Sequence, residues 1–225
     1  MSSAIQKWVM DPANHDFLAI VKGARNGLVY GCKVRFPHAL VMAALFSHKP
    51  WSTRIHGILT ATRTHAMSLA KFAVVYKIML LVQKRLNGGM ERDLDTFVAG
   101  GIGGYTVFGD RTPINEQIVL YIMSRAILSF IPRLYSNSPN PPKTPWQPPR
   151  PPPSIPYQPR GQPAPDPPPA NIPFAIVASL SWAAVMYMFR HRGERLQPGI
   201  INSMRYIYHE SDTWTSLKTL LWHNK

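Results

Sequence analysis

Five stretches of the chain are dominated by apolar residues, and a polar, proline-rich segment separates the first four from the fifth. None of the five is a clean apolar run of twenty residues, so hydropathy alone gives a weak membrane signal. Their lengths nevertheless predict helices. They cover residues 17–46, with a break near Phe36-Pro37, and residues 55–82, 96–109, 114–131 and 174–189.

Small residues recur every four positions in the first and third stretches. In a helix surrounded by water each glycine costs roughly 1 kcal/mol relative to alanine, whereas in a membrane this spacing lets two helix backbones approach closely. For the third stretch a flexible loop is the alternative. A nucleotide-binding loop is excluded there, because Thr106 stands where its third glycine would be. The expected helix-packing positions are Gly23, Gly27, Gly31, Gly100, Gly101 and Gly104.

The second stretch has three faces when it is drawn as a helix with about 100° per residue. Small residues, including Gly57 and Ala61, form a close-packing stripe, and large apolar residues form a second face. Arg63, Lys71 and Lys77 form a third, cationic face. Cations inside a membrane span usually face a bundle interior or a water-filled cavity. A soluble amphipathic helix with a solvated basic face is the alternative.

Apolar residues also repeat at helical spacing after the fifth stretch, in residues 200–208 and 214–221. Ser211 or Asp212 is the expected N-cap of the second of these helices, because their side-chain oxygens accept hydrogen bonds from the first turn. Both segments are typical of amphipathic helices that lie on a membrane or pack on a partner.

Proline divides the 225-residue chain, since 18 of its 23 prolines lie in residues 132–173. Proline has no backbone N–H to donate, so this segment predicts a solvated, polyproline-like, disordered loop. Its prolines also match the ligands of SH3-type domains, although any long proline run does so by chance. We expect three parts: a helical membrane core in residues 1–131, the loop in 132–173, and an apolar helix with amphipathic helices in 174–225.

The formal net charge is +14, from 25 Lys and Arg against 11 Asp and Glu. Such an excess of positive charge can indicate a nucleic-acid binder. Here, however, the basic residues are scattered within apolar stretches and are not clustered, so we expect no nucleic-acid partner. The eight histidines lack the spacing of a metal site, and the single cysteine, Cys32, has no base beside it in the sequence. We therefore expect no catalytic residues, no metal and no cofactor, and a protein that is not an enzyme.

Two acids, Asp110 and Glu116, flank the gap between the third and fourth stretches, and Arg125 lies in the middle of the fourth. A cation at that depth needs a partner or water. One interpretation is that Asp110, Glu116 or both pair with Arg63 or Arg125. The other is that acids near helix N-termini complement the helix dipole.

Specific blocks of residues occur on both sides of the proline-rich segment. They are Lys22-Gly-Ala-Arg-Asn-Gly27, Val29-Tyr-Gly31, Lys33-Val-Arg35, Pro37-His-Ala-Leu-Val-Met42, Gly104-Tyr-Thr-Val-Phe-Gly109, Ile114-Asn-Glu-Gln-Ile118, Tyr121-Ile-Met-Ser-Arg125, Leu196-Gln-Pro198, Ser203-Met204 and Tyr206-Ile-Tyr208. On these blocks the chain resembles the peroxisomal membrane protein 4 family over about 180 residues. The proline-rich segment looks like an insertion relative to that family. The family is similar, more distantly, to the Tim channel subunits of the mitochondrial inner membrane.

The resemblance implies a multi-pass protein of the peroxisomal membrane with four glycine-rich core helices. It also implies delivery by the peroxisomal membrane-protein import receptor, without a signal peptide. The pattern of the wider superfamily is approximated by Asp93, Ala99-Gly100 and Gly104, while Gly89 stands where that pattern has an arginine.

Together these observations predict an all-α membrane protein, with a bundle of about four glycine-rich transmembrane helices, then the loop, a further apolar helix and C-terminal amphipathic helices. We expect a non-enzymatic protein with a pore or transport role in the peroxisomal membrane. The alternatives are a structural or tethering protein that docks partners through its proline-rich loop, and a mitochondrial inner-membrane Tim-like translocase subunit. The lipid bilayer is the expected partner, and a homo-oligomer stays open. With five spans, the two ends of the chain would lie on opposite sides.

Overall fold

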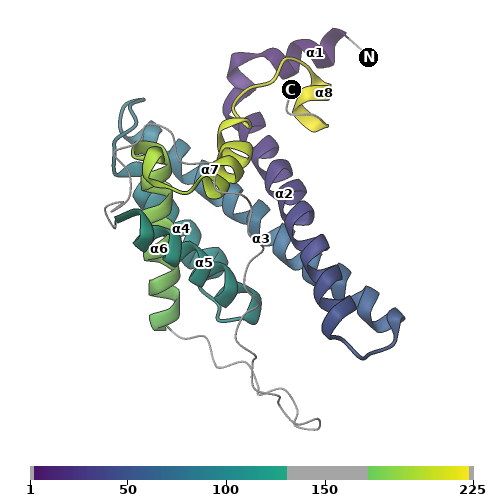
Figure 1. Ribbon diagram of the computed structural model, residues 1–225. Helices are drawn as coiled ribbons and strands as arrows, with labels where there is room; N and C mark the ends of the chain where they lie inside the picture. Colours follow the sequence, from purple (N-terminus) through teal and green to yellow (C-terminus); the bar gives the residue numbers. More distant parts are fainter. Residues whose placement is uncertain (1–2, 131–171, 223–225) are drawn as a thin grey trace, which may run out of the picture.

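A computed structural model describes residues 3–130 and 172–222, and helices take 84% of this part, which contains no strand. The all-α expectation is therefore confirmed. The proline-rich loop lies outside the described residues except for its last two, which begin α6, so the division into three parts stays a prediction. The elements are α1 (Ser3–Met10), η1 (Pro12–Asn14), α2 (His15–Phe46), α3 (Trp51–Leu86), α4 (Asp95–Phe108), α5 (Pro113–Phe130), α6 (Ile172–His191), η2 (Gly193–Arg195), α7 (Pro198–Met204), η3 (Arg205–His209) and α8 (Leu217–Leu221) (Figure 1).

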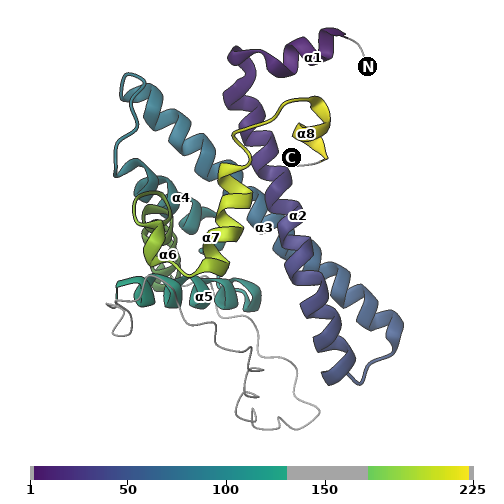
Figure 2. The same cartoon turned by 45° about the horizontal axis from the view of Figure 1, so that its top comes forward.

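The two longest helices, α2 and α3, form an antiparallel hairpin (Figures 1 and 2). α2 runs through Pro37 without ending, so the expected break near Phe36-Pro37 is wrong. Pro37 lies on an exposed side of the helix. In apolar surroundings the remaining backbone groups have no water to bond to, and this keeps a helix continuous across a proline.

Glycines set how closely α2 and α3 approach each other. A Cβ atom added at Gly27 would lie 2.9 Å from the backbone of Leu69, and one added at Gly31 would lie 2.5 Å from the Cα of Ala66. Only a residue without a side chain fits against a backbone at these distances. The close approach gains dispersion contacts along the whole interface, which offsets the low helix propensity of glycine.

The short helix α4 packs antiparallel to α6 through a second close contact. A Cβ atom at Gly100 would lie 2.9 Å from the carbonyl oxygen of Trp182, and one at Gly104 would lie 2.7 Å from that of Ala178. The ring of Trp182 also lies 4.1 Å from the ring of Phe72 on α3, measured between centroids. The helices before and after the proline-rich loop therefore share one core.

Three helical segments are long and apolar enough to cross a membrane: Pro12–Phe46, Trp51–Leu86 and Ile172–His191. The other two apolar stretches form shorter helices. α4 has 14 residues, which is about 21 Å and less than the ~30 Å hydrocarbon core of a bilayer. α5 has 18 residues and lies across the other helices (Figure 2).

The residues after α6 pack on the chain itself. Ile200, Met204, Ile207 and Tyr208 are each at most 5% exposed and belong to the same core as Phe72. From the sequence pattern, we expected their apolar face to meet a membrane or a partner. That face is instead covered by the chain's own helices.

The last helix begins later than its sequence pattern predicts. α8 is capped by Ser216, whose hydroxyl accepts a hydrogen bond from the N–H of Thr219 at 3.3 Å. The expected N-cap at Ser211 or Asp212 is wrong, because both side chains are used elsewhere. Ser211 donates to the carbonyl of Tyr208 at 2.8 Å, and Asp212 forms an ion pair with a lysine of α3.

The two ends of the described chain meet at one face of the molecule (Figure 1). Val9, Leu18 and Leu220 form a small apolar cluster there, and the Trp214 indole donates to the carbonyl of Val9 at 3.0 Å. Five spans would place the ends on opposite sides, so the contact between them does not fit five spans. α5 instead lies across the bundle (Figure 2).

We expect Gly31→Ala to destabilise the protein by about 1–3 kcal/mol, the usual cost of overpacking, because its Cβ would meet the backbone of Ala66. Gly199→Ala is the matched control: Gly199 of α7 has open space around it, so the better helix former gains up to ~1 kcal/mol. Thermal unfolding of the full chain in detergent measures both changes. A Gly31→Ala protein as stable as the parent would contradict the close approach.

Tags at the two ends of the chain should be accessible from the same side of the membrane, because α1 and α8 pack together. A third tag, inserted in the turn between α2 and α3, should be accessible only from the other side. Protease protection in intact and permeabilised organelles reads out all three. Opposite accessibility of the two ends would rule out this arrangement.

Candidate functional site

α2 buries two polar side chains on one face, Lys22 and Asn26, and neither is exposed to solvent. Lys22 Nζ donates to the carbonyl oxygen of Thr213 at 2.5 Å, and Asn26 Nδ2 donates to that of Tyr206 at 2.8 Å. Both acceptors lie in residues 205–222, here named the C-terminal strap. Buried polar groups are costly unless they are hydrogen-bonded, so α2 and the strap depend on each other.

Further polar contacts hold the strap against α2. Arg25 Nε donates to the carbonyl of Leu221 at 3.1 Å. His15 Nε2 lies 2.9 Å from the carbonyl oxygen of Asp212, and its ring stacks on Trp214 with 4.8 Å between centroids. Because the acceptors are backbone carbonyls, which every residue has, the sequence of the strap does not reveal these contacts.

Sequence reasoning missed Lys22 and Asn26 as functional positions. The available signal was weak: a lysine and an asparagine four residues apart, next to Gly23 and Gly27, in a mostly apolar stretch. That spacing places both on one side of a helix. Nothing local identifies their acceptors, which lie 191 and 180 residues away in the sequence.

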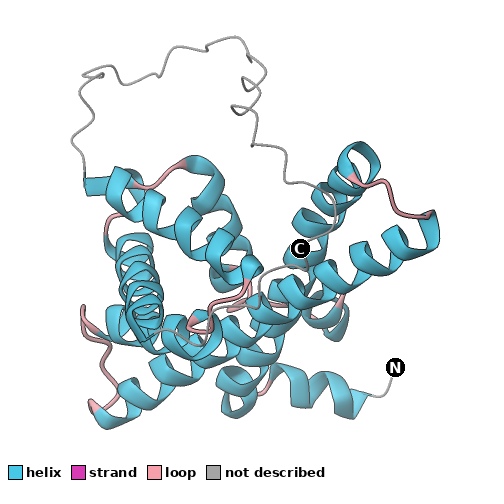
Figure 3. Ribbon diagram, turned by 90° about the horizontal axis from the view of Figure 1, so that it is seen from below, coloured by secondary structure: helices cyan, strands magenta, loops and turns pink. Residues whose placement is uncertain are grey.

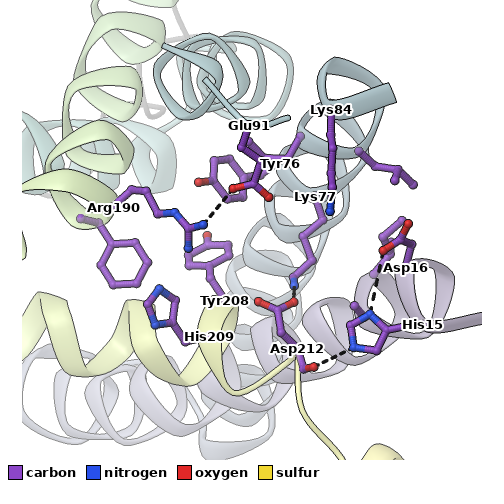
Figure 4. A pocket seen from close by; sticks show the side chains of 15 residues that line it. His15, Asp16, Tyr76, Lys77, Lys84, Glu91, Arg190, Tyr208, His209 and Asp212 are labelled. Carbon is purple, nitrogen blue, oxygen red and sulfur yellow. Dashed lines mark hydrogen bonds and ion pairs between the residues drawn. The ribbon is translucent and has the colours of Figure 1, made fainter. Parts of the chain in front are cut away.

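A pocket of about 240 Å³, here named the interfacial pocket, opens beside the strap (Figure 4). The first turns of α2, the last turns of α3, the end of α6 and the strap all contribute to it. Its apolar lining includes Ile20, Leu80, Leu81 and Phe189. Its ionisable side chains, all of them labelled in Figure 4, are His15, Asp16, Tyr76, Lys77, Lys84, Glu91, Arg190, Tyr208, His209 and Asp212.

Two ion pairs already join opposite charges in the interfacial pocket (Figure 4). Lys77 pairs with Asp212, and Arg190 pairs with Glu91 at 2.8 Å. Lys84 has no hydrogen bond or ion pair through its side chain within residues 3–130 and 172–222. The carboxylate of Asp16 lies 3.9 Å from His15 Nδ1. Among the described residues, Lys84 therefore has no ion-pair partner, and Asp16 has only a histidine at 3.9 Å.

Two of the strap residues that line the pocket, Tyr208 and His209, are uncharged at neutral pH. Burial, and then the nearby Arg190, lower the pKa of His209 below its ordinary value of 6.5. Burial raises the pKa of Tyr208 well above its ordinary value of 10. Neither group therefore changes the balance between Lys84 and Asp16.

The remaining expected packing positions lie in different surroundings. A Cβ atom at Gly23 would lie 3.0 Å from the side chain of Lys77, and one at Gly101 would lie 3.3 Å from Ser179 Oγ. Ser179 also donates to the carbonyl of Gly101 at 2.8 Å. Ala61 is partly exposed, and Gly57 has open space around it. Unlike Gly27 and Gly31, Gly57 therefore contacts no other helix closely within the described part of a single chain.

The three expected cations of α3 separate into two groups. Lys77 is drawn into the interfacial pocket by Asp212. Arg63 and Lys71 are exposed, and neither makes a hydrogen bond or ion pair with another described residue. They lie on either side of the middle of α3, which runs from Trp51 to Leu86.

The expected pairing of Asp110 or Glu116 with Arg63 or Arg125 is not found. Glu116 accepts a hydrogen bond from Arg111 Nε at 2.7 Å, because both lie at the short turn that leads into α5. Asp110 is exposed. Arg125 lies over the ring of Tyr121, with 4.8 Å between its Cζ and the ring centroid, a cation–π contact that partly compensates its charge.

The charged side chains of the interfacial pocket are suited to binding a small charged ligand. In the two described ranges, no group of three or more His, Cys, Asp or Glu side chains could hold a metal ion. The cations of the interfacial pocket are Lys and Arg, which donate hydrogen bonds to anions. The site can therefore bind a small charged group.

Comparison with known proteins adds independent findings. The family model described as Tim17/Tim22/Tim23/Pmp24 matches residues 13–124, from η1 into α5. Peroxisomal membrane protein 4 of Homo sapiens is 33% identical over 211 residues, which are 94% of this chain and 87% of that protein. Peroxisomal membrane protein 4 of Bos taurus is 34% identical with the same coverage. No solved structure matches.

We expect Asn26→Leu to destabilise the protein by about 1–3 kcal/mol, because the carbonyl of Tyr206, which is partly buried, loses the hydrogen bond that Asn26 donates. The strap should also become cleavable at low protease concentration, well before the helices. Asn202→Leu is the control, since Asn202 is exposed on α7. Thermal unfolding and limited proteolysis measure both effects. Equal protection of the strap in the two variants would show that Asn26 does not hold it.

Proposed function

Because this chain belongs to the peroxisomal membrane protein 4 family, within the broader Tim17/Tim22/Tim23/Pmp24 family, we propose that it forms part of a path for small anions across a membrane. It is a multi-pass protein of the peroxisomal membrane, with helices embedded in the lipid bilayer. The proposed role is non-enzymatic.

The observation that carries the proposal is the polar face of α3, defined by Thr60, Arg63, Thr64 and Lys71. All four side chains lie toward the surface of the chain, and they occupy the middle of a candidate span. A charged side chain facing lipid at that depth costs several kcal/mol, about 2.5–3.5 by insertion measurements. Such residues therefore face water or another protein. A cationic, hydroxyl-lined face in water favours anions.

The polar face lies on the outside of a single chain, so the path would be completed by a second copy. A homo-oligomer is thus part of this proposal. The same face could then be shielded from lipid without any acidic partner. Gly57 and Ala61 lie beside this polar face on α3. Both residues are small enough for the helices of two copies to approach closely there.

The family membership also bears on delivery and on the alternatives. We propose that the peroxisomal membrane-protein import receptor inserts the chain. The relatives named for peroxisomes favour this over a mitochondrial translocase role. In addition, Gly89 has a φ of +89°, a conformation in which the arginine of the superfamily pattern would be strained. The tethering alternative depends on the proline-rich loop, which lies outside the described residues.

The test is flux of a radiolabelled small dicarboxylate from vesicles that contain the purified full chain. Arg63→Ala and Lys71→Ala should each lower the flux by roughly tenfold, equivalent to about 1.4 kcal/mol. Arg85→Ala is the matched control, because Arg85 is an exposed cation at the end of the same helix. Arg63→Glu should shift the preference from anions to cations.

Two outcomes would sink the proposal: no flux above that of empty vesicles, or equal flux in the parent and the Arg63→Ala protein. Folding of each variant is checked by its thermal unfolding profile. A variant that folds normally but conducts less supports a direct role for the charge.

A further inference from the structure

The interfacial pocket lies where three candidate spans reach the same side of the molecule. Its lining comes from the start of α2, the last turns of α3 and the end of α6, and the strap covers it. Since these helix ends mark the limit of the apolar segments, the pocket lies at the level of the lipid headgroups. The lining combines charged side chains with Ile20, Leu80 and Leu81, a mixture that fits that boundary.

We propose that the interfacial pocket binds the zwitterionic headgroup of a membrane phospholipid, with Lys84 against its phosphate and Asp16 against its ammonium group. In the view of Figure 4, Lys84 and Asp16 lie on the right, Arg190 lies on the left, and Glu91, which pairs with Arg190, lies between them. Lys84 is the only one of the three Lys and Arg side chains lining the described pocket that forms no ion pair there. A ligand with one negative and one positive group can pair with Lys84 through the first and with Asp16, whose only charged neighbour among the described residues is His15, through the second.

Charge balance favours this headgroup over an anionic one. The lining has three permanent cations, Lys77, Lys84 and Arg190, and three carboxylates, Asp16, Glu91 and Asp212. Four of these six are already paired. An anionic headgroup would satisfy Lys84 but bring a second negative charge near Asp16, and like charges at close range repel.

Size and surroundings favour a lipid over a larger soluble ligand. The volume of about 240 Å³ is below the ~300–1,000 Å³ of pockets that enclose drug-sized molecules. It suits a headgroup whose acyl chains stay outside. Ile78 and Val82, on the same part of α3, are each about 40% exposed and offer an apolar surface on which those chains can lie.

The experiment measures binding of radiolabelled dihexanoyl phosphatidylethanolamine, below its micelle concentration, to the full chain in detergent. Unlabelled dihexanoyl phosphatidylethanolamine should compete at least about tenfold better than dihexanoyl phosphatidylglycerol, dihexanoylglycerol or free phosphoethanolamine. Equal competition by free phosphoethanolamine overturns the assignment to a lipid. Equal competition by all three lipids overturns the assignment of a headgroup site.

Substitutions test the contributions of Lys84 and Asp16 to binding one at a time. Lys84→Met should weaken binding by roughly tenfold or more, the loss expected for one charge-assisted contact. Arg85→Met, which removes the neighbouring cation outside the pocket, should leave binding unchanged. Asp16→Lys should preserve binding of a phosphate but reverse the preference in favour of phosphatidylglycerol. Unchanged selectivity in a folded Asp16→Lys protein overturns the proposal, whatever the result of the flux experiment.

Discussion

The hydrogen bonds from Lys22 and Asn26 to the carbonyls of the C-terminal strap are the contacts on which the rest of the arrangement depends. They allow a largely apolar helix to bury a lysine and an asparagine, and they hold the strap along the first half of α2. In this position the strap places Tyr208 in the aromatic core and Asp212 next to Lys77. The interfacial pocket and the meeting of the two chain ends both follow from it.

Polar contacts and exposed apolar side chains lie in two different regions of the helix bundle, which Figure 3 shows from below. Charged and polar contacts gather where α2 begins and α3 and α6 end. At the opposite tip of the hairpin the large apolar side chains are exposed; Leu45 and Phe46, for example, are 69% and 67% exposed. Such a surface is unfavourable in water and suits contact with lipid. The cations Arg63 and Lys71 are the exception, since they lie between these regions on the exposed side of α3.

The local pattern of apolar residues predicted the positions of the helices to within a few residues. The stretch predicted at residues 96–109 is α4 (Asp95–Phe108), and the one at residues 174–189 lies within α6 (Ile172–His191). Apolar periodicity is local, so a short window contains it. The failures at Pro37 and at the cap of α8 have the opposite cause. There the outcome depended on the surroundings of the helix and on which distant partners had already engaged Ser211 and Asp212.

The sequence by itself determined an all-α, glycine-spaced membrane protein and its family, because composition, periodicity and residue blocks are properties of the chain alone. Only the tertiary structure decided which charges meet. Lys77 and Asp212 are 135 residues apart, and Lys22 reaches a backbone carbonyl 191 residues away. A lysine in a sequence has many potential acceptors of similar chemistry. Which one it meets is set by the packing of α2, α3 and the strap, where the close approach at Gly27 and Gly31 fixes their register.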